Sequence, residues 1–391
     1  MITASRSLCW LLKSSDHMRK ILWLVLAVLS VVLLYRGYEA LQEHRRLQHR
    51  VAEARQILSI PIHASGKEHA IHAAGMAFRE MLLEGRFAEI ETAEKRIREQ
   101  RELIADGQPR LAALYRGVAM CVDKKCPDAD APEADWIAVH ERLEQWAETG
   151  SVLALLARVH FQRAYAWRAR GPGFVDTVPS EQWPIFRQRV AAAQALFAEL
   201  PAAAAQMPWY AELMLLLHRD GGNWSRTEAL QAYEYARARD PWYLSLYFVR
   251  GSLSAPKWGG SIAEHAEFVE QEIARADSPD LAAVLYARLH WSNQSWMMFA
   301  DKIASWPKFR DSFDRLVELH PDQWNINNYG QFACNAGDHV RLHEQLLRME
   351  YVIVPAWHDL DLYIDCRDRL LQFKYGAIAV DQALASLLDR R

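Results

Sequence analysis

Pro208-Trp209-Tyr210 returns in the sequence as Pro241-Trp242-Tyr243, 33 residues later. Each copy opens an apolar run, Leu213–Leu217 in the first and Leu244–Val249 in the second, and a Gly221-Gly222-Asn223 breaker lies between them. A helix, a turn, a second helix and a proline restart at about 34 residues are typical of tetratricopeptide-type arrays. The stretch therefore predicts stacked helical hairpins.

The same pattern extends beyond this stretch in both directions. Proline restarts fall at Pro208, Pro241, Pro279, Pro321 and Pro355, at spacings of 33, 38, 42 and 34 residues. Nearly all of the chain after Pro61 is helix-periodic, and no run alternates long enough between apolar and polar residues to predict a strand. We therefore predict an all-α body over 61–391, a tetratricopeptide-like helical-hairpin array (α-solenoid).

Composition and charge fit a folded protein that does not bind nucleic acid. The 391 residues are 51% hydrophobic and 24% charged, with a net charge of −3. Residues 51–391 carry 38 Lys and Arg against 46 Asp and Glu, whereas nucleic-acid binding requires a basic surface. The fifteen Trp are expected to pack between helices.

An uncharged apolar run near the N-terminus predicts a membrane anchor. Ile21–Tyr35 lies between Arg19-Lys20 and Arg36, and it is shorter than the ~20 residues of a straight span, although flanking Lys and Arg can snorkel. A cleaved signal peptide and a buried helix are the alternatives, but no small-x-small cleavage site follows the run. We predict a tail at 1–20, a transmembrane anchor at 21–36 and a helical stalk at 37–60.

Several motifs resemble one uncharacterised bacterial family, the domain of unknown function numbered 4034. They are Pro241-Trp242-Tyr243, Leu246-Tyr247-Phe248, Pro256–Ser261, Tyr286-Ala287-Arg288, and Trp324-Asn325 through Phe332-Ala333-Cys334 to Gly337-Asp338. The resemblance covers roughly 81–349 and implies a tetratricopeptide-like array. It implies no activity, because the family has none assigned.

The cysteines bear on which side of the membrane the body lies, since the positive charges flanking the anchor are nearly balanced. Cys9 precedes the anchor, and the other four cysteines follow it. We predict disulfides between Cys121 and Cys126 and between Cys334 and Cys366, hence a single-pass inner-membrane protein with a periplasmic body. Free buried thiols and a cytoplasmic body remain the alternative.

Polar and aromatic side chains on the first helix of each pair are the candidates for binding a partner. Such positions line the concave face of a helical array, where they can bond to a peptide backbone. The candidates are Tyr243, Tyr247, Arg250, Tyr286, Arg288, Asn325 and Asn328. The alternative for each is that tyrosines pack and asparagines cap helices. We predict a membrane-anchored scaffold or adaptor that binds a protein or peptide.

The second hypothesis is an enzyme with an acid/base site in the concave groove, assembled from His290, Asp361 or Glu318. No spacing in the sequence demands it, and no Gly-x-Ser-x-Gly elbow is present. We favour the binding protein over the enzyme.

We predict no metal and no cofactor. His63, His69 and His72 lack the further ligands of a zinc site, and the aspartates near Asp361 lack the glycine of a calcium loop. Lys257–Ser261 could present backbone N–H groups to an anion, but it lacks phosphate-loop spacing. This segment therefore predicts a turn that packs Trp258, with Ser261 capping the helix 262–276.

Overall fold

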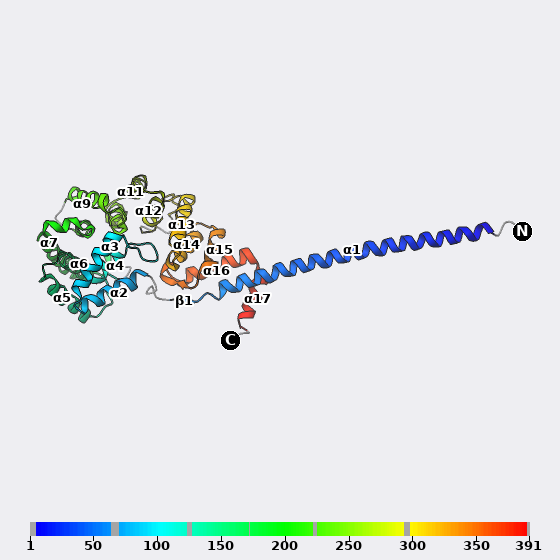
Figure 1. Cartoon of the computed structure of the whole chain (residues 1–391), viewed down its shortest axis with the longest axis horizontal. Helices are drawn as coiled ribbons and strands as arrows, with labels where there is room; N and C mark the ends of the chain where they lie inside the picture. The colour runs from blue at the N-terminus through cyan, green and yellow to red at the C-terminus, as the bar shows by residue number, and fades with distance from the viewer. Residues whose placement is uncertain are drawn as a thin grey trace. The chain divides into compact units, whose positions relative to one another are not determined.

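The computed structural model describes residues 5–63, 70–122, 127–171, 173–221, 225–292 and 298–388. Side chains are described from Trp23 onward within these ranges, except that of Val25. The chain divides into two compact units, unit 1 (residues 1–60 and 367–391) and unit 2 (residues 61–366). The described residues are almost entirely helical, which confirms the all-α prediction (Figure 1).

Unit 1 is built on one long helix. Helix α1 (Ser5–Leu58) packs near its C-terminal end on α17 (Ala377–Leu388), where Ala54 and Ile57 are fully buried. The guanidinium of Arg50 donates to the carbonyl of Tyr375. The predicted body began at residue 61, as unit 2 does, but it also included 367–391. These last residues group with α1 because α17 buries Ala379, Val380 and Ala383 within unit 1.

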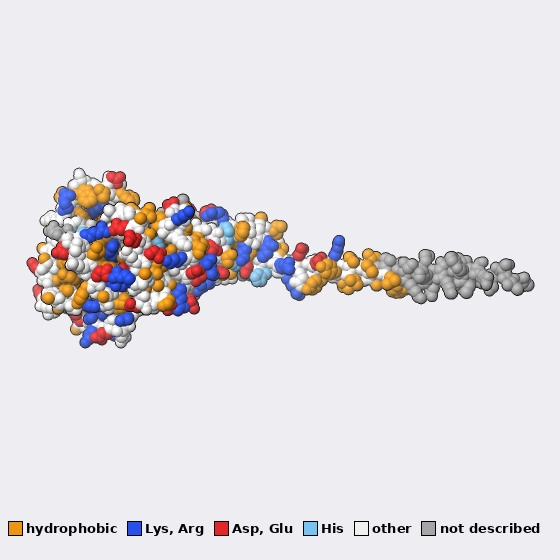
Figure 2. Space-filling view, turned by 90° about the horizontal axis from the view of Figure 1, so that it is seen from above, with side chains coloured by type: hydrophobic (Ala, Val, Ile, Leu, Met, Phe, Trp, Pro, Cys, Tyr) orange, Lys and Arg blue, Asp and Glu red, His pale blue; other side chains and the backbone are white. Residues whose placement is uncertain are grey.

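The N-terminal half of α1 exposes apolar side chains on all sides of the helix. These residues are 46–75% exposed: Trp23, Leu24, Leu26, Val28, Leu29, Val31, Val32, Leu33, Leu34, Tyr35 and Tyr38. Figure 2 shows them as an orange segment beside the residues drawn in grey. Within the described residues, no helix is both long enough and apolar enough to cross a membrane. Ile21, Leu22 and Val25 of the predicted anchor lie outside the described side chains.

Unit 2 is a succession of packed helices. It begins with α2 (Ala70–Leu83), α3 (Phe87–Gln100), α4 (Arg110–Val118), α5 (Glu133–Ala147), α6 (Val152–Arg170) and α7 (Gln182–Ala198). Four hairpins follow: α8 (Pro208–Arg219) with α9 (Arg226–Arg239), α10 (Leu244–Ser254) with α11 (Ile262–Ala274), α12 (Pro279–Ser292) with α13 (Trp306–Leu319), and α14 (Gln323–Asn335) with α15 (His339–Arg348). The first residues of helix α16 (Leu360–Tyr375) belong to unit 2, and its residues from Arg367 onward belong to unit 1. The predicted hairpin pattern thus matches the observed helices.

Short elements complete unit 2. The 3-10 turns are η1 (Val175–Thr177), η2 (Ala202–Gln206), η3 (Pro256–Trp258) and η4 (Val354–Ala356). Strands β1 (Ile62–His63) and β2 (Val352–Ile353) form a two-residue parallel pair. This pair joins the first and last parts of unit 2.

Local sequence signals fix the helix starts. Pro208 occupies the first turn of α8, where its missing N–H costs nothing. Ser225 and Glu228 form a capping box at α9. The Ser261 hydroxyl accepts from the Glu264 N–H at 3.0 Å, so the predicted cap is confirmed. Asp338 caps α15 in the same way.

The repeated aromatic residues meet in the centre of unit 2. Tyr115 of α4 stacks on Trp209 of α8, with ring centroids 4.1 Å apart, and lies edge-on to Tyr243 at 6.0 Å. All three are at most 1% exposed. Removal of such a ring costs about 3–5 kcal/mol. Tyr115 of α4 therefore packs against the starts of both α8 and α10.

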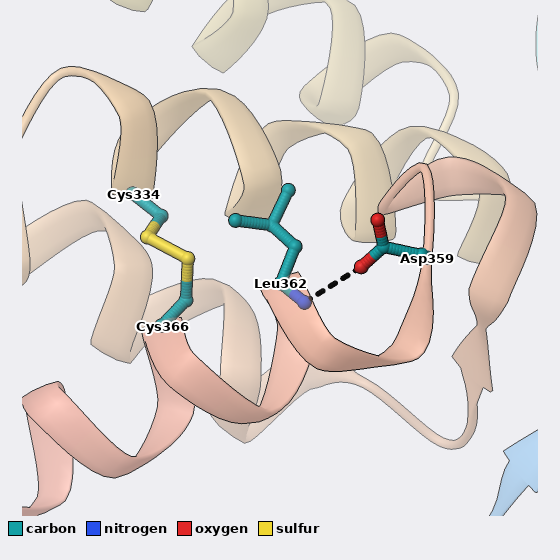
Figure 3. The surroundings of a disulfide bond; sticks show 4 residues. All are labelled: Cys334, Asp359, Leu362 and Cys366. Atoms are coloured by element: carbon teal, nitrogen blue, oxygen red, sulfur yellow. Dashed lines mark hydrogen bonds between the residues drawn. A yellow bond between two sulfur atoms is a disulfide. The ribbon is translucent and has the colours of Figure 1, made fainter.

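A disulfide ties two helices together near the end of unit 2. Cys334 of α14 bonds to Cys366 of α16, with Cα atoms 5.9 Å apart, which is the pairing predicted from the sequence (Figure 3). Asp359 caps α16 by accepting from the N–H of Leu362 at 2.8 Å. Cys121 is also disulfide-bonded, but its predicted partner Cys126 lies outside the described residues.

Candidate functional site

The predicted partner-binding residues lie inside unit 2 rather than on an open groove. Tyr243, Tyr247, Tyr286, Arg288, Asn325 and Asn328 are at most 4% exposed, and Arg250 is half-buried. Tyr115 of α4 packs against Tyr243, and the segment before α4 contacts Arg288 and Asn325. A partner cannot reach these six side chains in this conformation.

Their polar atoms make internal contacts. The Tyr243 hydroxyl donates to Glu212, and the Tyr247 hydroxyl donates to the Pro241 carbonyl at 3.0 Å. Asn328 donates to a carbonyl of its own helix at 2.7 Å. Tyr286 accepts from the N–H of Ser305 at 3.1 Å, and Arg250 stacks 4.7 Å above the ring of Phe268. These contacts correspond to the packing alternative in the sequence analysis.

Arg288 and Asn325 do bind a peptide backbone, but it belongs to the same chain. Residues 102–110 form a small hairpin, closed by the N–H of Arg110 donating to the Glu102 carbonyl at 2.9 Å. At its tip, the carbonyl of Asp106 accepts from Arg288 and, at 2.9 Å, from the amide of Asn325. Asp106 is fully buried. The 102–110 hairpin thus occupies part of the inner face predicted to hold a partner.

The proposed acid/base residues do not converge. His290 is buried, with its ring 4.6 Å from Tyr286 and 6.1 Å from His265. Burial, and then the charges of His265 and Lys308, lower the pKa of His290 to about 3. Glu318 is an exposed partner of Arg315, and Asp361 is exposed on α16. No contact among the described residues joins the three into a site.

A different group of side chains, the basic–aromatic cluster, has the chemistry of a binding site. It consists of Arg163, Trp167 and Arg170 of α6, Trp183 of α7, Arg219 of α8, the adjacent Asp220, and Trp258 of η3. The Asp220 side chain is 0% exposed and lies at the centre. Its carboxylate contacts Arg163 Nε at 2.7 Å, Trp167 Nε1 at 2.7 Å and Arg219 Nε at 3.3 Å.

Indole rings enclose these cations. The Arg170 guanidinium lies 4.8 Å from the ring centroid of Trp167 and 5.1 Å from that of Trp183. Arg219 lies 4.4 Å from the Trp258 centroid. Stacking on an aromatic face stabilises a partly desolvated guanidinium, by up to about 2 kcal/mol. The cluster therefore holds its arginines in fixed positions.

Positive charge exceeds negative charge in the cluster. The cluster holds three guanidinium groups and one carboxylate, which contacts Arg163 and Arg219, and these two side chains are 5% and 14% exposed. Outside the cluster, the Glu212 carboxyl also interacts with the charge of Arg163. Burial lowers the pKa of Arg219 to about 10, an effect that Asp220 opposes and Arg163 reinforces. Burial likewise lowers the pKa of Arg170. Buried charges are normally paired, so this arrangement favours an anionic ligand.

The sequence contained a local signal for part of this cluster. Arg163, Trp167 and Arg170 follow at spacings of four and three, which places them on one helix face. Trp258 was predicted to pack in a turn, and it does so, edge-on to Trp167 at 5.9 Å. The meeting of α6, α8 and η3 around Asp220 requires the tertiary fold, so sequence analysis missed the cluster.

Comparison with known proteins does not place this chain in a family. No protein-family model, curated protein or solved structure matches the chain. The resemblance described from the sequence motifs therefore stays a prediction.

Proposed function

We propose that this protein is a membrane-anchored helical-repeat scaffold or adaptor that binds a peptide or protein partner through unit 2. The observation that carries the proposal is the combination of an apolar helix exposed on all sides in unit 1 with a buried excess of arginine charge in unit 2. The first calls for an apolar environment, and the second calls for an anionic ligand.

The apolar segment of α1 supports the membrane half of the proposal. A helix that is apolar around its whole circumference is suited to a hydrophobic core or to lipid. Leu33 and Leu34 are 69% and 75% exposed. In the sequence the uncharged run extends from Ile21 to Tyr35, and the flanking Arg36 is suited to the lipid interface. Burying such side chains gains about 1.5–3 kcal/mol each.

The disulfide supports an extracytoplasmic position for unit 2. Disulfides form and persist in oxidising compartments and are rare in the cytosol. With Cys334 bonded to Cys366, we propose a single-pass inner-membrane protein whose unit 2 faces the periplasm.

Vesicle flotation tests the membrane half. The full-length chain is expected to float with neutral phosphatidylcholine vesicles in high salt, because apolar burial is not screened. The double variant Leu26→Arg with Leu33→Arg is expected to remain in the dense fraction. A matched variant, Gln48→Arg with Glu43→Arg, changes the same helix in its polar half and is expected to float. Equal flotation of all three proteins would mean that the apolar segment is not the anchor.

The enzyme remains the alternative function. A buried, desolvated acid exists in unit 2, since burial raises the pKa of Glu212 although the Tyr243 hydrogen bond opposes the rise. However, Glu212 is 7% exposed, accepts from the Tyr243 hydroxyl, and interacts with the charges of Arg116 and Arg163. The contacts of Glu212 therefore favour a structural role.

A further inference from the structure

The basic–aromatic cluster has both unbalanced charge and an unused donor. Among the described residues, Asp220 is the carboxylate that contacts its arginines, and Arg170 donates instead to the carbonyls of Gly171 and Gly173, each at 3.0 Å. The indole Nε1 of Trp258 is buried and has no hydrogen-bond partner within the described part of the chain. A buried donor without an acceptor costs about 1–3 kcal/mol. Both features would be relieved by one added oxyanion.

The cluster reaches the surface beside apolar side chains. Trp167, Trp183 and Trp258 are each half-buried. The contact between Arg170 and the Gly173 carbonyl places the loop leading to η1 against the cluster, and Phe174 and Val175 on this loop are 81% and 71% exposed. Exposed apolar side chains beside a charged, aromatic-lined site are typical of a recognition surface.

We propose that the basic–aromatic cluster is a binding site for a carboxylate carried next to an aromatic or large apolar side chain, as in an acidic segment of a partner protein. The carboxylate lies against Arg170, Arg219 and the Trp258 Nε1, and the apolar neighbour packs on Phe174 and the indole rings. This inference deepens the proposed binding function and rests on it.

Charge and donor number favour a carboxylate over a phosphate. Arginine binds both groups through its planar fork of N–H donors. The buried carboxylate of Asp220 already accepts from the cluster, and it repels a dianion more strongly than a singly charged group. The apolar rim cannot solvate the third oxygen of a phosphate. A single carboxylate is therefore the better match.

Thermal unfolding of the full-length chain, in one mild detergent, tests the site with three small probes. N-acetylphenylalanine carries a carboxylate beside a ring, N-acetylphenylalaninamide carries the ring alone, and inorganic phosphate is the competing oxyanion. We expect N-acetylphenylalanine to raise Tm in a saturable way, by roughly 4 °C at one hundred times its Kd. The amide is expected to leave Tm unchanged.

Two variants of Arg170 and a matched control locate the effect. Arg170→Gln is expected to raise the half-saturating concentration of N-acetylphenylalanine about 10- to 100-fold, and Arg170→Lys by less because it keeps the charge. Arg189→Gln is the control: Arg189 is half-buried whereas Arg170 is buried, but it likewise stacks on a ring, that of Tyr165 at 3.5 Å, and donates to a carbonyl at 2.8 Å. It is expected to respond like the unaltered protein.

The outcomes separate this inference from the proposed function. A response to the amide equal to that of the acid, a response to phosphate but not to the acid, or an unaltered response of Arg170→Gln would each overturn the carboxylate site. Circular dichroism and vesicle flotation of the same samples report folding and anchoring independently. If N-acetylphenylalanine does not raise Tm while the protein still floats with vesicles, the carboxylate assignment is wrong and the proposed membrane anchoring is unaffected.

Discussion

Gly107 at the tip of the 102–110 hairpin provides a sharp test of how the inner face of unit 2 is filled. Its φ is +87°, in the region that favours glycine, and a Cβ there would lie 2.3 Å from Cδ2 of the His320 ring. Gly107→Ala should therefore introduce both backbone strain and a steric clash. Gly85→Ala is the matched control, because Gly85 has φ +73° and open space around its Cβ position.

The two substitutions share the backbone strain, and only Gly107→Ala adds the clash. Backbone strain for a residue with a Cβ at positive φ is about 1–2 kcal/mol and applies to both positions. Overpacking costs about 1–3 kcal/mol and applies to Gly107 alone. The gain from reduced freedom of the unfolded chain, about 0.4–1 kcal/mol, is common to both. We expect Gly107→Ala to lower the free energy of unfolding by about 1–3 kcal/mol more than Gly85→Ala.

Urea denaturation of both full-length variants, followed by tryptophan fluorescence, measures this difference. A second readout is proteolysis within residues 102–110, which should be faster in Gly107→Ala because the hairpin is displaced from Arg288 and Asn325. If the two variants lose equal stability and are cleaved alike, the hairpin does not dock against His320, and the account of a filled inner face fails.

Three further predictions concern the core and the disulfide. Trp209→Ala should cost about 3–5 kcal/mol in urea denaturation, against less than about 0.5 kcal/mol for the 73% exposed Phe373→Ala; similar losses would contradict the stacked Tyr115–Trp209 centre. Replacing both Cys334 and Cys366 by Ser should cost about 3.7 kcal/mol for the 32-residue separation, and an unchanged stability in non-reducing buffer would show that the bond is not formed. Because burial lowers the pKa of His290 to about 3 from 6.5, the unfolded state binds more protons between these values, so stability should fall as pH drops through that window. His290→Gln should reduce the slope of unfolding free energy against pH in this window by up to about 1.4 kcal/mol per pH unit. A difference in stability between the two proteins that does not change with pH would refute this role of His290.

Much of the fold could be predicted because it depends on local signals. The proline restarts mark helix beginnings, Ser261 forms the expected cap, and the interval between Cys334 and Cys366, close to one repeat, placed them on neighbouring helices. These features depend on residues within one hairpin or between adjacent hairpins. Periodicity and spacing are sufficient for such contacts.

The site could not be predicted because it depends on contacts between distant segments. Asp106 and Arg288 are 182 residues apart, and nothing in the 102–110 hairpin sequence indicates where its tip docks. For the same reason, six of the seven residues predicted to line an open groove were found in the core. Asp220 contacts arginines of α6 and α8 and an indole N–H of α6. These contacts form only when the two helices pack together.

Photo-crosslinking from the surface beside the basic–aromatic cluster tests the central claim most directly, namely that unit 2 binds a partner at this surface. p-Benzoylphenylalanine replaces Phe174, 81% exposed, or, as the control, Phe373, 73% exposed in unit 1, and the full-length chain is irradiated in its native membranes. We predict a discrete protein adduct from position 174 that decreases with Arg170→Gln and with added N-acetylphenylalanine. Adducts of equal yield from both positions, or an adduct indifferent to Arg170→Gln, would contradict a partner-binding surface at the cluster.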